Sequence, residues 1–343
     1  MKKAIIYGVT GQDGSYLAEL LLSKGYTVYG VTRRTSSDNT TRIKLLSNQK
    51  QFHLVQGDVT DSFNIYRLLN EVQPDEIYNL AAQSHVGTSF HQPELTWAVT
   101  GQGCMNILEA IRTSSLANRV RFYQASSSEM FGDQFSLDEN GEKYQDEKTR
   151  FAPQSPYAIA KLAAHNTVAL YRRSYGLFAC GGILFNHESE RRGSKFVTRK
   201  ISRYVSKVYW ATQQGRSIPK LKLGNLESKR DWGHAEDYVE AMWLMLQQDE
   251  PDDYVVATGE THSVADFLDA AFEAVGISDW SNLVYIDPKF YRPAEVDYLL
   301  GIPAKAENKL GWERKISFSD LAERMVKFDV EKTKLRRSSI QAV

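Results

Sequence analysis

Ala4-Ile-Ile-Tyr-Gly-Val-Thr-Gly-Gln-Asp-Gly14 joins a short apolar run to a turn that contains three glycines. The apolar residues predict a buried strand over Ala4–Tyr7, and a helical pattern follows over Ser15–Lys24. Glycines in such a turn allow a tight bend, close approach of the backbone to a pyrophosphate and close packing of the helix, whose N-terminus attracts phosphate. A plain glycine-rich turn is the alternative, and the strand–turn–helix context favours dinucleotide binding over it.

The rest of the chain repeats this alternation of strand and helix. Further strands are predicted at Thr27–Thr32, Phe52–Gln56, Glu76–Asn79, Arg121–Gln124, Ala179–Leu184 and Asp253–Ala257. Helical patterns occupy Ser62–Val72, Thr96–Thr113, Pro156–Tyr175, Phe196–Tyr204 and Ala235–Gln247. Such alternation is typical of a parallel sheet covered on both faces. The sequence therefore predicts an α/β fold, with a doubly wound, Rossmann-type nucleotide domain and a smaller α/β substrate lobe.

The two parts are expected to interleave along the chain. After Leu184 the regular pattern gives way to a long stretch of basic, glycine and aromatic residues, and a helix resumes at Ala235. We predict that residues 1–186 and 233–258 form the nucleotide domain, and that residues 187–232 and 259–330 form the substrate lobe. Residues 331–343 carry several Lys and Arg residues and are expected to form a frayed tail.

The overall charge argues against bulk attraction to polyanions. Lys and Arg together number 42, as do Asp and Glu, which predicts no nucleic-acid partner and no membrane attachment. No apolar run approaches the roughly 18 residues of a membrane span. Cys104 and Cys180 lack metal-ligand spacing, so we expect reduced, buried thiols in a cytoplasmic protein without a bound metal.

The end of the second predicted strand indicates which dinucleotide is bound. Sites for NAD usually place an acidic residue there to hold the ribose hydroxyls. Here Val31-Thr32 continues into Arg33-Arg34-Thr35-Ser36-Ser37, and two guanidinium groups beside hydroxyls suit a 2′-phosphate. The sequence thus favours NADP, with a solvated basic turn as the alternative. We expect Asp58 and Val59 to meet the adenine, and Leu80-Ala81-Ala82 to leave room for a ribose.

A second polar constellation follows the fifth predicted strand. Phe122-Tyr-Gln-Ala-Ser-Ser-Ser-Glu-Met-Phe-Gly132 predicts a buried strand that ends in three hydroxyls and a carboxylate. Tyr157 and Lys161 are four residues apart in a helical pattern, and hence on one face. Beside a cationic cofactor, such a Lys can lower the pKa of the phenol from about 10 toward neutrality and make it a usable base. A surface pair is the alternative, and the glycine-rich turn favours catalysis.

These motifs resemble those of extended short-chain dehydrogenases that act on nucleotide sugars. The resemblance rests on Gly8–Gly14, on Ala81-Ala82-Gln83-Ser84-His85-Val86, and on Tyr157 with Lys161. Three further stretches are similar to the GDP-mannose 4,6-dehydratase family: Leu184–Ser189 with Arg191-Arg192-Gly193, Arg230–Ala235, and Tyr291–Asp297. The resemblance covers residues 3–330. It implies a tightly held NADP, a GDP-sugar substrate, and a homotetramer in which the Arg34–Arg42 loop reaches the cofactor of a neighbouring subunit.

The resemblance also implies which residues contact the ligands. Cofactor contacts are expected from Gly8, Thr10, Gly11, Gln12, Asp13, Gly14, Arg33, Arg34, Asp58, Val59, Leu80, Ala81, Ala82, Ser84, Tyr157, Lys161, His187 and Arg192. Substrate contacts are expected from Ser84, Ser127, Glu129, Tyr157, Asn186, Lys200, Gly224, Arg230, Arg292 and Glu295. Lys200, Arg230 and Arg292 would bind the pyrophosphate, because guanidinium forks match phosphate oxygens, although each one alone is more typical of a surface charge. Glu295 would hold the guanosine ribose, and Asn186 the pyrophosphate or the sugar.

A 4,6-dehydration would give each of four catalytic residues a role. Tyr157, aided by Lys161, would take the proton of the sugar 4-hydroxyl while a hydride leaves C4. Ser127 would donate a hydrogen bond to the developing 4-keto oxygen. Glu129 would remove the C5 proton and protonate the departing 6-hydroxyl, because Ser128 stands where dehydratases of dTDP- or UDP-sugars place an Asp. A helix-capping or salt-bridged Glu129 is the alternative.

The chain departs from the family pattern at three places. Ser127 replaces a threonine, and its hydroxyl can donate the same hydrogen bond. Glu190 stands where a proline is usual, near the expected substrate entrance, and Ile302-Pro303-Ala304 replaces an Asp-Pro-Ser type of turn.

The expected reaction is the conversion of GDP-mannose to GDP-4-keto-6-deoxy-mannose. Alternatives are the same dehydration of a GDP-manno-heptose, a nucleotide-sugar epimerase or reductase, and a catalytically idle NADP-binding regulator. An epimerase needs no carboxylate for elimination at C5, so Glu129 argues against it. An idle regulator would be expected to lose Tyr157, Lys161 or Glu129, and all three are present.

Overall fold

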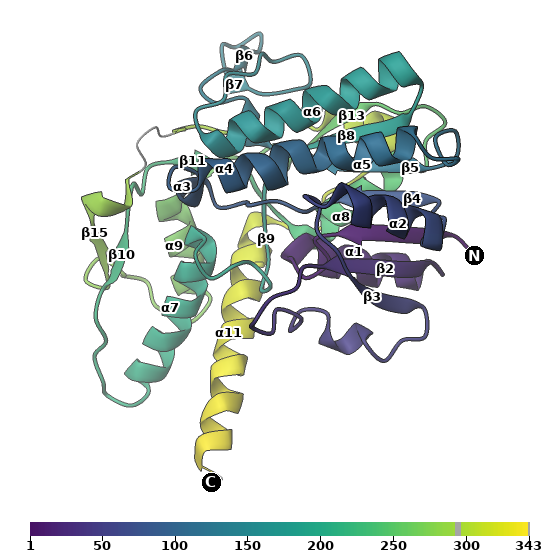
Figure 1. Ribbon diagram of the computed structural model, residues 1–343. Helices are drawn as coiled ribbons and strands as arrows, with labels where there is room; N and C mark the ends of the chain where they lie inside the picture. Colours follow the sequence, from purple (N-terminus) through teal and green to yellow (C-terminus); the bar gives the residue numbers. More distant parts are fainter. Residues whose placement is uncertain (292–295, 342–343) are drawn as a thin grey trace.

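A computed structural model describes residues 1–291 and 296–341 of the chain. At its centre these residues form a sheet of seven strands, in the spatial order β13-β8-β5-β4-β1-β2-β3 (Figure 1). The strands are β1 (Lys3–Tyr7), β2 (Thr27–Thr32), β3 (Phe52–Gln56), β4 (Glu76–Asn79), β5 (Arg121–Ala125), β8 (Phe178–Leu184) and β13 (Asp253–Val256). All neighbouring strands run parallel. The strand order reverses between β1 and β4, which is where ligands bind in open α/β sheets. The predicted doubly wound α/β fold is confirmed.

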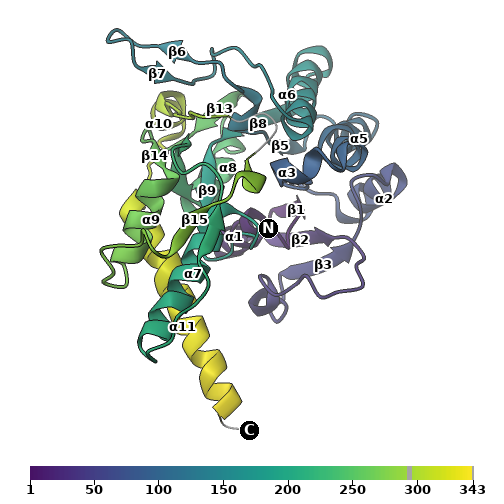
Figure 2. The ribbon, with the colours of Figure 1, turned by 90° about the vertical axis from the view of Figure 1, so that its left-hand side faces the viewer.

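Helices cover both faces of this sheet (Figure 2). One face carries α2 (Ser62–Val72), α5 (Gly103–Arg112) and α6 (Pro156–Tyr175), and the other carries α1 (Gln12–Ser23) and α8 (Ala235–Met245). Each face has its own apolar cluster, with Ile107 fully buried in the first and Leu17 in the second. Burial on both faces explains why the strands have continuous apolar runs rather than alternating ones.

Helix α6 has clear local signals at both of its ends. The Ser155 side chain accepts a hydrogen bond from the Ala158 amide, and Pro156 occupies the first helical position. Gly176 ends the helix in the left-handed region, with φ of +66°. The helix therefore begins and ends where the sequence predicts, which fixes Tyr157 in its first turn.

Four predicted helices differ in extent from the observed ones, and two of them differ most. The pattern over Thr96–Thr113 is divided among α4 (Pro93–Thr96), a π-helical segment (Trp97–Gln102) and α5. Helix α7 (Val197–Thr212) is longer than the predicted Phe196–Tyr204, because Val205, Val208 and Ala211 continue its buried face.

The second lobe is built around α7, α9 (Val264–Glu273) and α11 (Phe318–Gln341). Its apolar cluster includes Ile201, Phe267 and Met325, which are fully buried. A buried ion pair between Arg199 and Asp329, joined by Ser202, links α7 to α11. The lobe also holds a small parallel sheet of β10 (Leu221–Leu223) and β15 (Val284–Ile286).

Two short strand pairs lie near or beyond the predicted boundary between the lobes. Strand β9 (Asn186–Glu188) pairs in parallel with β12 (Trp232–His234), and β11 (Lys229–Arg230) pairs antiparallel with β14 (His262–Ser263). Two of the predicted domain boundaries, after residue 186 and before residue 233, fall inside the β9–β12 pair. The division into domains remains a prediction. The remaining elements are α3 (Val86–Ser89), β6 (Ser136–Leu137), β7 (Lys143–Tyr144), α10 (Ala304–Leu310) and three 3₁₀ turns at Lys44–Leu46, Ser128–Met130 and Pro288–Phe290.

The C-terminal segment differs from its prediction. A frayed tail was expected from Glu331, but α11 continues as a helix to Gln341. Trp210 and Ser206 on α7 hydrogen-bond Val330 and Thr333, so contacts with α7 support this part of α11. No helix in the described part of the chain combines the length and apolar character needed to cross a membrane.

Candidate active site

The glycine-rich turn lies at the switch point of the sheet, between β1 and α1. Gly8 has φ of +87°, and a Cβ there would lie 2.9 Å from the carbonyl carbon of Leu80. A Cβ on Gly14 would lie 2.3 Å from the carbonyl oxygen of Gly8. Helix α1 begins at Gln12, earlier than predicted, and Gly11 gives it no side-chain cap, so its first N–H groups remain for a ligand. This close backbone approach and uncapped helix end fit the pyrophosphate of a dinucleotide.

Asp13 and His187 form an ion pair beside this turn. The His187 Nε2 atom is 2.9 Å from Asp13 Oδ2, and its Nδ1 atom is 2.7 Å from the Phe185 carbonyl oxygen. Each of these two acceptors faces one nitrogen of the imidazole ring. Burial acts to raise the pKa of Asp13, but the charge and hydrogen bond of His187 outweigh it and lower that pKa to about 2. The two residues thus place opposite charges at the predicted cofactor site.

The predicted catalytic residues converge where β5 ends and α6 begins. Ser127 caps the 3₁₀ turn after β5, and its Oγ atom accepts a hydrogen bond of 3.3 Å from the Glu129 amide. Tyr157 and Lys161 lie on α6. The Tyr157 phenol is close enough to the Ser127 side chain for that side chain to affect its pKa, and Lys161 Nζ donates to the Ala125 carbonyl oxygen at 2.5 Å. All four side chains are buried, none more than 9% exposed. The sequence therefore brings its hydroxyl, carboxylate, phenol and ammonium into one desolvated cluster.

Burial shifts the pKa values of Tyr157 and Lys161 in this cluster. Burial raises the pKa of Tyr157 to about 12, although the hydrogen bond with Ser127 and the charge of Arg192 act to lower it. The sequence predicts a lowered pKa at Tyr157 only for Lys161 beside a cationic cofactor, and this stays a prediction. Burial also lowers the pKa of Lys161 itself, to about 8. The predicted shift at Tyr157 therefore depends on the positive charge of a cofactor as well as on Lys161.

These groups line one cleft of about 1020 Å³, which runs from the glycine-rich turn into the second lobe. The cleft brings together most of the predicted ligand contacts: Gly8, Thr10, Gly11, Gln12, Asp13, Gly14, Arg33, Asp58, Val59, Leu80, Ala81, Ala82, Ser84, Ser127, Glu129, Tyr157, Lys161, Asn186, His187, Arg192, Lys200, Gly224 and Arg230. Arg34 is exposed and lies outside this lining. Arg292 and Glu295 lie outside the described residues.

The loop after β2 is held at its far end by its own chain. Arg42 donates hydrogen bonds to the carbonyl oxygens of Arg191, at 2.7 Å, and Thr10, at 3.2 Å. Ile43 follows and is buried, which gives the loop an apolar anchor just beyond the predicted Arg34–Arg42 segment. Arg42 thus contacts the glycine-rich turn within one chain, a contact that the sequence did not predict.

The substrate end of the cleft carries cations and unpaired polar groups. The Lys200 ammonium lies 5.0 Å from the centre of the Phe290 ring, and burial lowers its pKa. Arg230 is only 6% exposed and donates to the Lys229 carbonyl oxygen at 2.8 Å. The buried Asn186 Oδ1 atom has no hydrogen-bond partner among the described residues. These groups are arranged to meet an anionic, hydrogen-bonding ligand.

Sequence reasoning missed several residues of this lining. Among them are Glu188, Phe196, Ser228, Lys289, Phe290 and Tyr291. Glu188 lies 3.0 Å from Arg192, whose guanidinium is 3.7 Å from the centre of the Phe196 ring, so both residues orient a predicted cofactor contact. Glu188 and Tyr291 lie in the stretches Leu184–Ser189 and Tyr291–Asp297, which resemble the family, and this resemblance could have identified them. No pattern in the sequence marks the other residues.

Known proteins with similar sequences and structures indicate the family of the chain. A family model described as GDP-mannose 4,6 dehydratase matches residues 5–325. The GDP-mannose 4,6 dehydratase of Cricetulus griseus is 50% identical over 352 residues, which cover 96% of this chain and 92% of that protein. The structure of DesIV, a dTDP-glucose 4,6-dehydratase from Streptomyces venezuelae with NAD bound, superposes with a TM-score of 0.81 at 22% identity, covering 97% of this chain and 98% of that one. RMD from Pseudomonas aeruginosa, complexed with NADPH, gives 0.76 at 19% identity, covering 97% and 100%. These two structures share the fold, and the family match extends over most of the sequence. The chain belongs to the GDP-mannose 4,6-dehydratase family.

Proposed function

We propose that this protein dehydrates GDP-mannose to GDP-4-keto-6-deoxy-mannose. Family membership supports the reaction class, and one structural observation carries the assignment to this site. Ser127, Glu129, Tyr157 and Lys161 form a buried cluster in the same cleft as the uncapped N-terminus of α1. A base, a carboxylate and a dinucleotide cradle are the parts that an internal oxidation–elimination–reduction needs.

The proposed cofactor is NADP. Nicotinamide dinucleotides are bound in the similar structures of DesIV and RMD, as NAD and NADPH respectively. In this chain Arg33 lines the cleft just after β2, and Val31 and Thr32 end that strand without a carboxylate. A guanidinium at this position suits a 2′-phosphate better than a free ribose hydroxyl. When bound, NADP⁺ would accept a hydride from C4 of the sugar and return it to C6.

Tyr157 is the proposed base for the sugar 4-hydroxyl. Burial raises the pKa of its phenol, and Ser127 and Arg192 act against that rise. Lys161 is anchored through Ala125, which keeps its ammonium at the base of the site. Ser127 then donates to the oxygen at C4 as it becomes a ketone.

Glu129 is the proposed acid and base for the elimination. Four acidic residues line the cleft in the described part of the chain: Asp13, Asp58, Glu129 and Glu188. Glu129 is close enough to Tyr157 to raise its pKa. It would remove the C5 proton, which the C4 ketone makes acidic, and then protonate the 6-hydroxyl, which leaves as water.

The substrate pyrophosphate is proposed to contact Lys200 and Arg230. Asn186 and Ser84 would lie nearer the sugar, and Gly224 would lie near the guanine base. The cleft lining supports these placements. A Cβ on Gly224 would lie 2.8 Å from the Phe290 carbonyl oxygen, so this backbone approaches its neighbour closely. Arg292 and Glu295 keep the roles that the family resemblance implies.

A homotetramer is proposed as the working assembly. Large apolar side chains remain exposed along the α5–α6 side of the molecule, among them Trp97, Met105, Ile159, Leu170 and Tyr175. Such a concentration of exposed apolar residues is typical of a surface that a second copy covers. The exposed Arg34 would meet the cofactor of a neighbouring subunit.

Product analysis tests the reaction directly. The NADP-loaded protein is incubated with GDP-mannose, a GDP-manno-heptose, GDP-glucose and UDP-glucose, and the products are weighed by mass spectrometry. We expect GDP-mannose to lose the mass of one water. In deuterated buffer, the product should gain deuterium at C5. No mass loss with any sugar, from protein that binds the cofactor, would refute the dehydration.

A further inference from the structure

Residues 187–191, called the strap here, bind the first turns of α1 side chain by side chain. His187 pairs with Asp13, and the Ser189 hydroxyl donates to the Gln12 amide oxygen at 2.8 Å. Gln12 in turn donates to the His187 carbonyl oxygen at 3.0 Å. The strap therefore contacts the two residues that open the helix behind the glycine-rich turn.

Arg191 extends these contacts along the same helix. Its guanidinium donates to the Ser15 hydroxyl at 3.0 Å, pairs with Glu19 at 3.0 Å, and lies 3.9 Å from the centre of the Tyr16 ring. Its carbonyl oxygen accepts from Arg42, which also binds the Thr10 carbonyl oxygen. The glycine-rich turn is thereby held from both sides.

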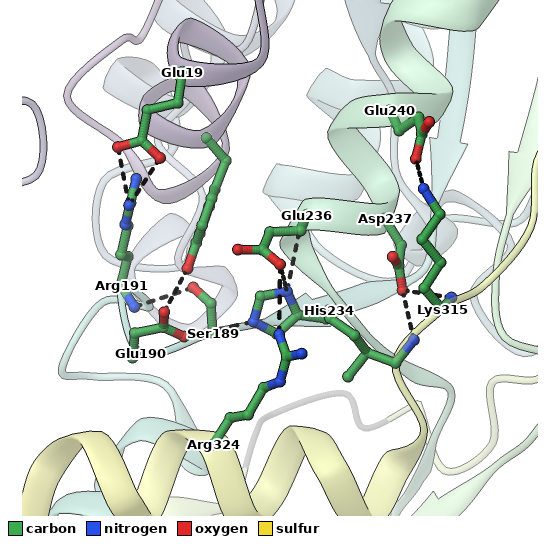
Figure 3. Close-up of polar contacts among 12 residues, drawn as sticks. Glu19, Ser189, Glu190, Arg191, His234, Glu236, Asp237, Glu240, Lys315 and Arg324 are labelled. Carbon is green, nitrogen blue, oxygen red and sulfur yellow. Dashed lines mark hydrogen bonds and ion pairs between the residues drawn. The ribbon is translucent and has the colours of Figure 1, made fainter. Parts of the chain in front are cut away.

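Glu190 lies beside His234, at the start of α8 (Figure 3). Its Oε1 atom accepts a hydrogen bond of 2.9 Å from the Tyr16 hydroxyl, and its Oε2 atom lies 3.5 Å from His234 Nε2. The Nδ1 atom of His234 accepts a hydrogen bond from the Glu236 amide at the start of α8, so Nε2 is the ring nitrogen that faces the carboxylate. Glu190 thus connects α1 to the start of α8.

The surroundings of Glu190 hold its carboxylate ionised. Burial acts to raise its pKa, but the neighbouring His234 ring, its own amide and the Tyr16 hydroxyl outweigh this and lower the pKa to about 2. Tyr16 is only 4% exposed, and its ring packs edge-on against His234, with ring centroids 5.8 Å apart. Loss of the carboxylate would leave the buried Tyr16 hydroxyl without this acceptor, and such a group is costly.

We propose that Glu190 is a positioning residue for the cofactor: by fixing Tyr16 and the strap together, it holds the N-terminal turns of α1 in place around the bound dinucleotide. The inference rests on the proposed NADP site and deepens it. The strap continues along the chain into Arg192 and then into α7. If the strap were held less firmly, we expect the cofactor to dissociate faster, with no change in the chemistry at Tyr157.

The test measures release of cofactor, not turnover. Holoprotein loaded with NADPH is mixed with excess NADP⁺, and the fall in NADPH fluorescence gives the dissociation rate. Glu190→Ala is expected to raise that rate about threefold or more, as the loss of part of one buried, charge-assisted hydrogen bond would. Glu190→Gln keeps an acceptor for Tyr16 and should fall between the wild type and the Ala variant.

Three further variants separate positioning from a general loss of stability. Tyr16→Phe should raise the rate similarly, and the double variant Tyr16→Phe with Glu190→Ala should be no faster than the faster single variant. Glu236→Gln alters the other carboxylate near His234, 3.9 Å from its Nδ1 atom, without touching α1, and should leave the rate unchanged. All rates are taken at a temperature at which circular dichroism shows each variant folded.

The outcomes are distinct. If Glu190→Ala releases NADPH at the wild-type rate, or Glu236→Gln accelerates release equally, the positioning role is wrong while the proposed reaction stands. If the wild-type protein binds neither NADPH nor NADH, the proposed function itself fails.

Discussion

The Lys161 ammonium donates a hydrogen bond of 2.5 Å to the main-chain carbonyl oxygen of Ala125. This bond ties α6 to the last residue of β5, two residues before Ser127. The bond therefore holds α6, which carries Tyr157, against the strand end that leads to Ser127. Precise placement of this kind is what proton transfer requires.

Glu129→Gln should stop the elimination. The amide cannot accept the C5 proton, so water loss should fall by about 10²–10⁴-fold, and deuterium exchange at C5 should stop as well. Cofactor affinity should be unchanged. Glu139→Gln, on the exposed turn between β6 and β7, serves as the matched control and should behave as the wild type. Near wild-type water loss by Glu129→Gln would remove this residue from the mechanism.

Ser127 should tolerate the larger hydroxyl residue but not its removal. Ser127→Thr keeps the donor and is expected to stay active, whereas Ser127→Ala should lower the rate by about tenfold, the worth of one hydrogen bond. The Ser127 side chain also acts to lower the pKa of Tyr157. The Ala variant should therefore need a higher pH to reach its maximal rate. A pH–rate profile of both variants checks this, and an unshifted profile for Ser127→Ala would contradict it.

Arg33 should set the preference between the two dinucleotides. Wild-type protein should prefer NADP over NAD, and Arg33→Ala should narrow that preference by about 1.5 kcal/mol, the lower end for a charge-assisted bond because Arg33 is exposed. Titration calorimetry with both cofactors gives the two affinities. Equal binding of NADP and NAD by the wild type would sink the assignment.

Lys161 should give the apoprotein a stability that rises with pH. Its pKa is about 8 in the folded chain against 10.5 for an ordinary lysine, so between these values the unfolded chain binds more protons. Stability then increases with pH across this window, by about 3 kcal/mol in all. Urea unfolding of the wild type and Lys161→Met at pH 7, 8.5 and 10 isolates the effect. The difference between them should move in favour of the wild type as pH rises, and a constant difference would rule out the lowered pKa.

The assembly should depend on the loop after β2. Light scattering of the holoprotein should give the mass of a tetramer, and removal of NADP or the change Arg34→Ala should weaken it, because occupancy and assembly are linked. Arg42→Ala acts differently, since Arg42 binds Thr10 within its own chain, and should weaken cofactor binding even in a dissociated subunit. A monomer mass at all concentrations would refute the shared loop, though not the catalytic assignment.

The fold could be predicted from local patterns because each strand and its flanking helix are adjacent in sequence. Strands β2 and β3 and helices α2 and α6 have the bounds that the sequence predicts, since caps such as Ser155 and turns such as Gly176 act within a few residues. The pairing of Tyr157 with Lys161 is likewise local, as four residues make about one helical turn. Motif spacing thus located the catalytic groups and the glycine-rich turn.

Contacts between distant segments were decided only by the tertiary structure. No local signal places Glu190 against Tyr16, residues separated by 174 positions, or turns Arg42 back onto Thr10. The pKa of Tyr157 also follows from burial by the whole domain, which the spacing to Lys161 does not report. Helix caps and turns act through neighbouring atoms and are written in the sequence, whereas desolvation and ion pairs across the cleft arise only when the sheet and both lobes have assembled.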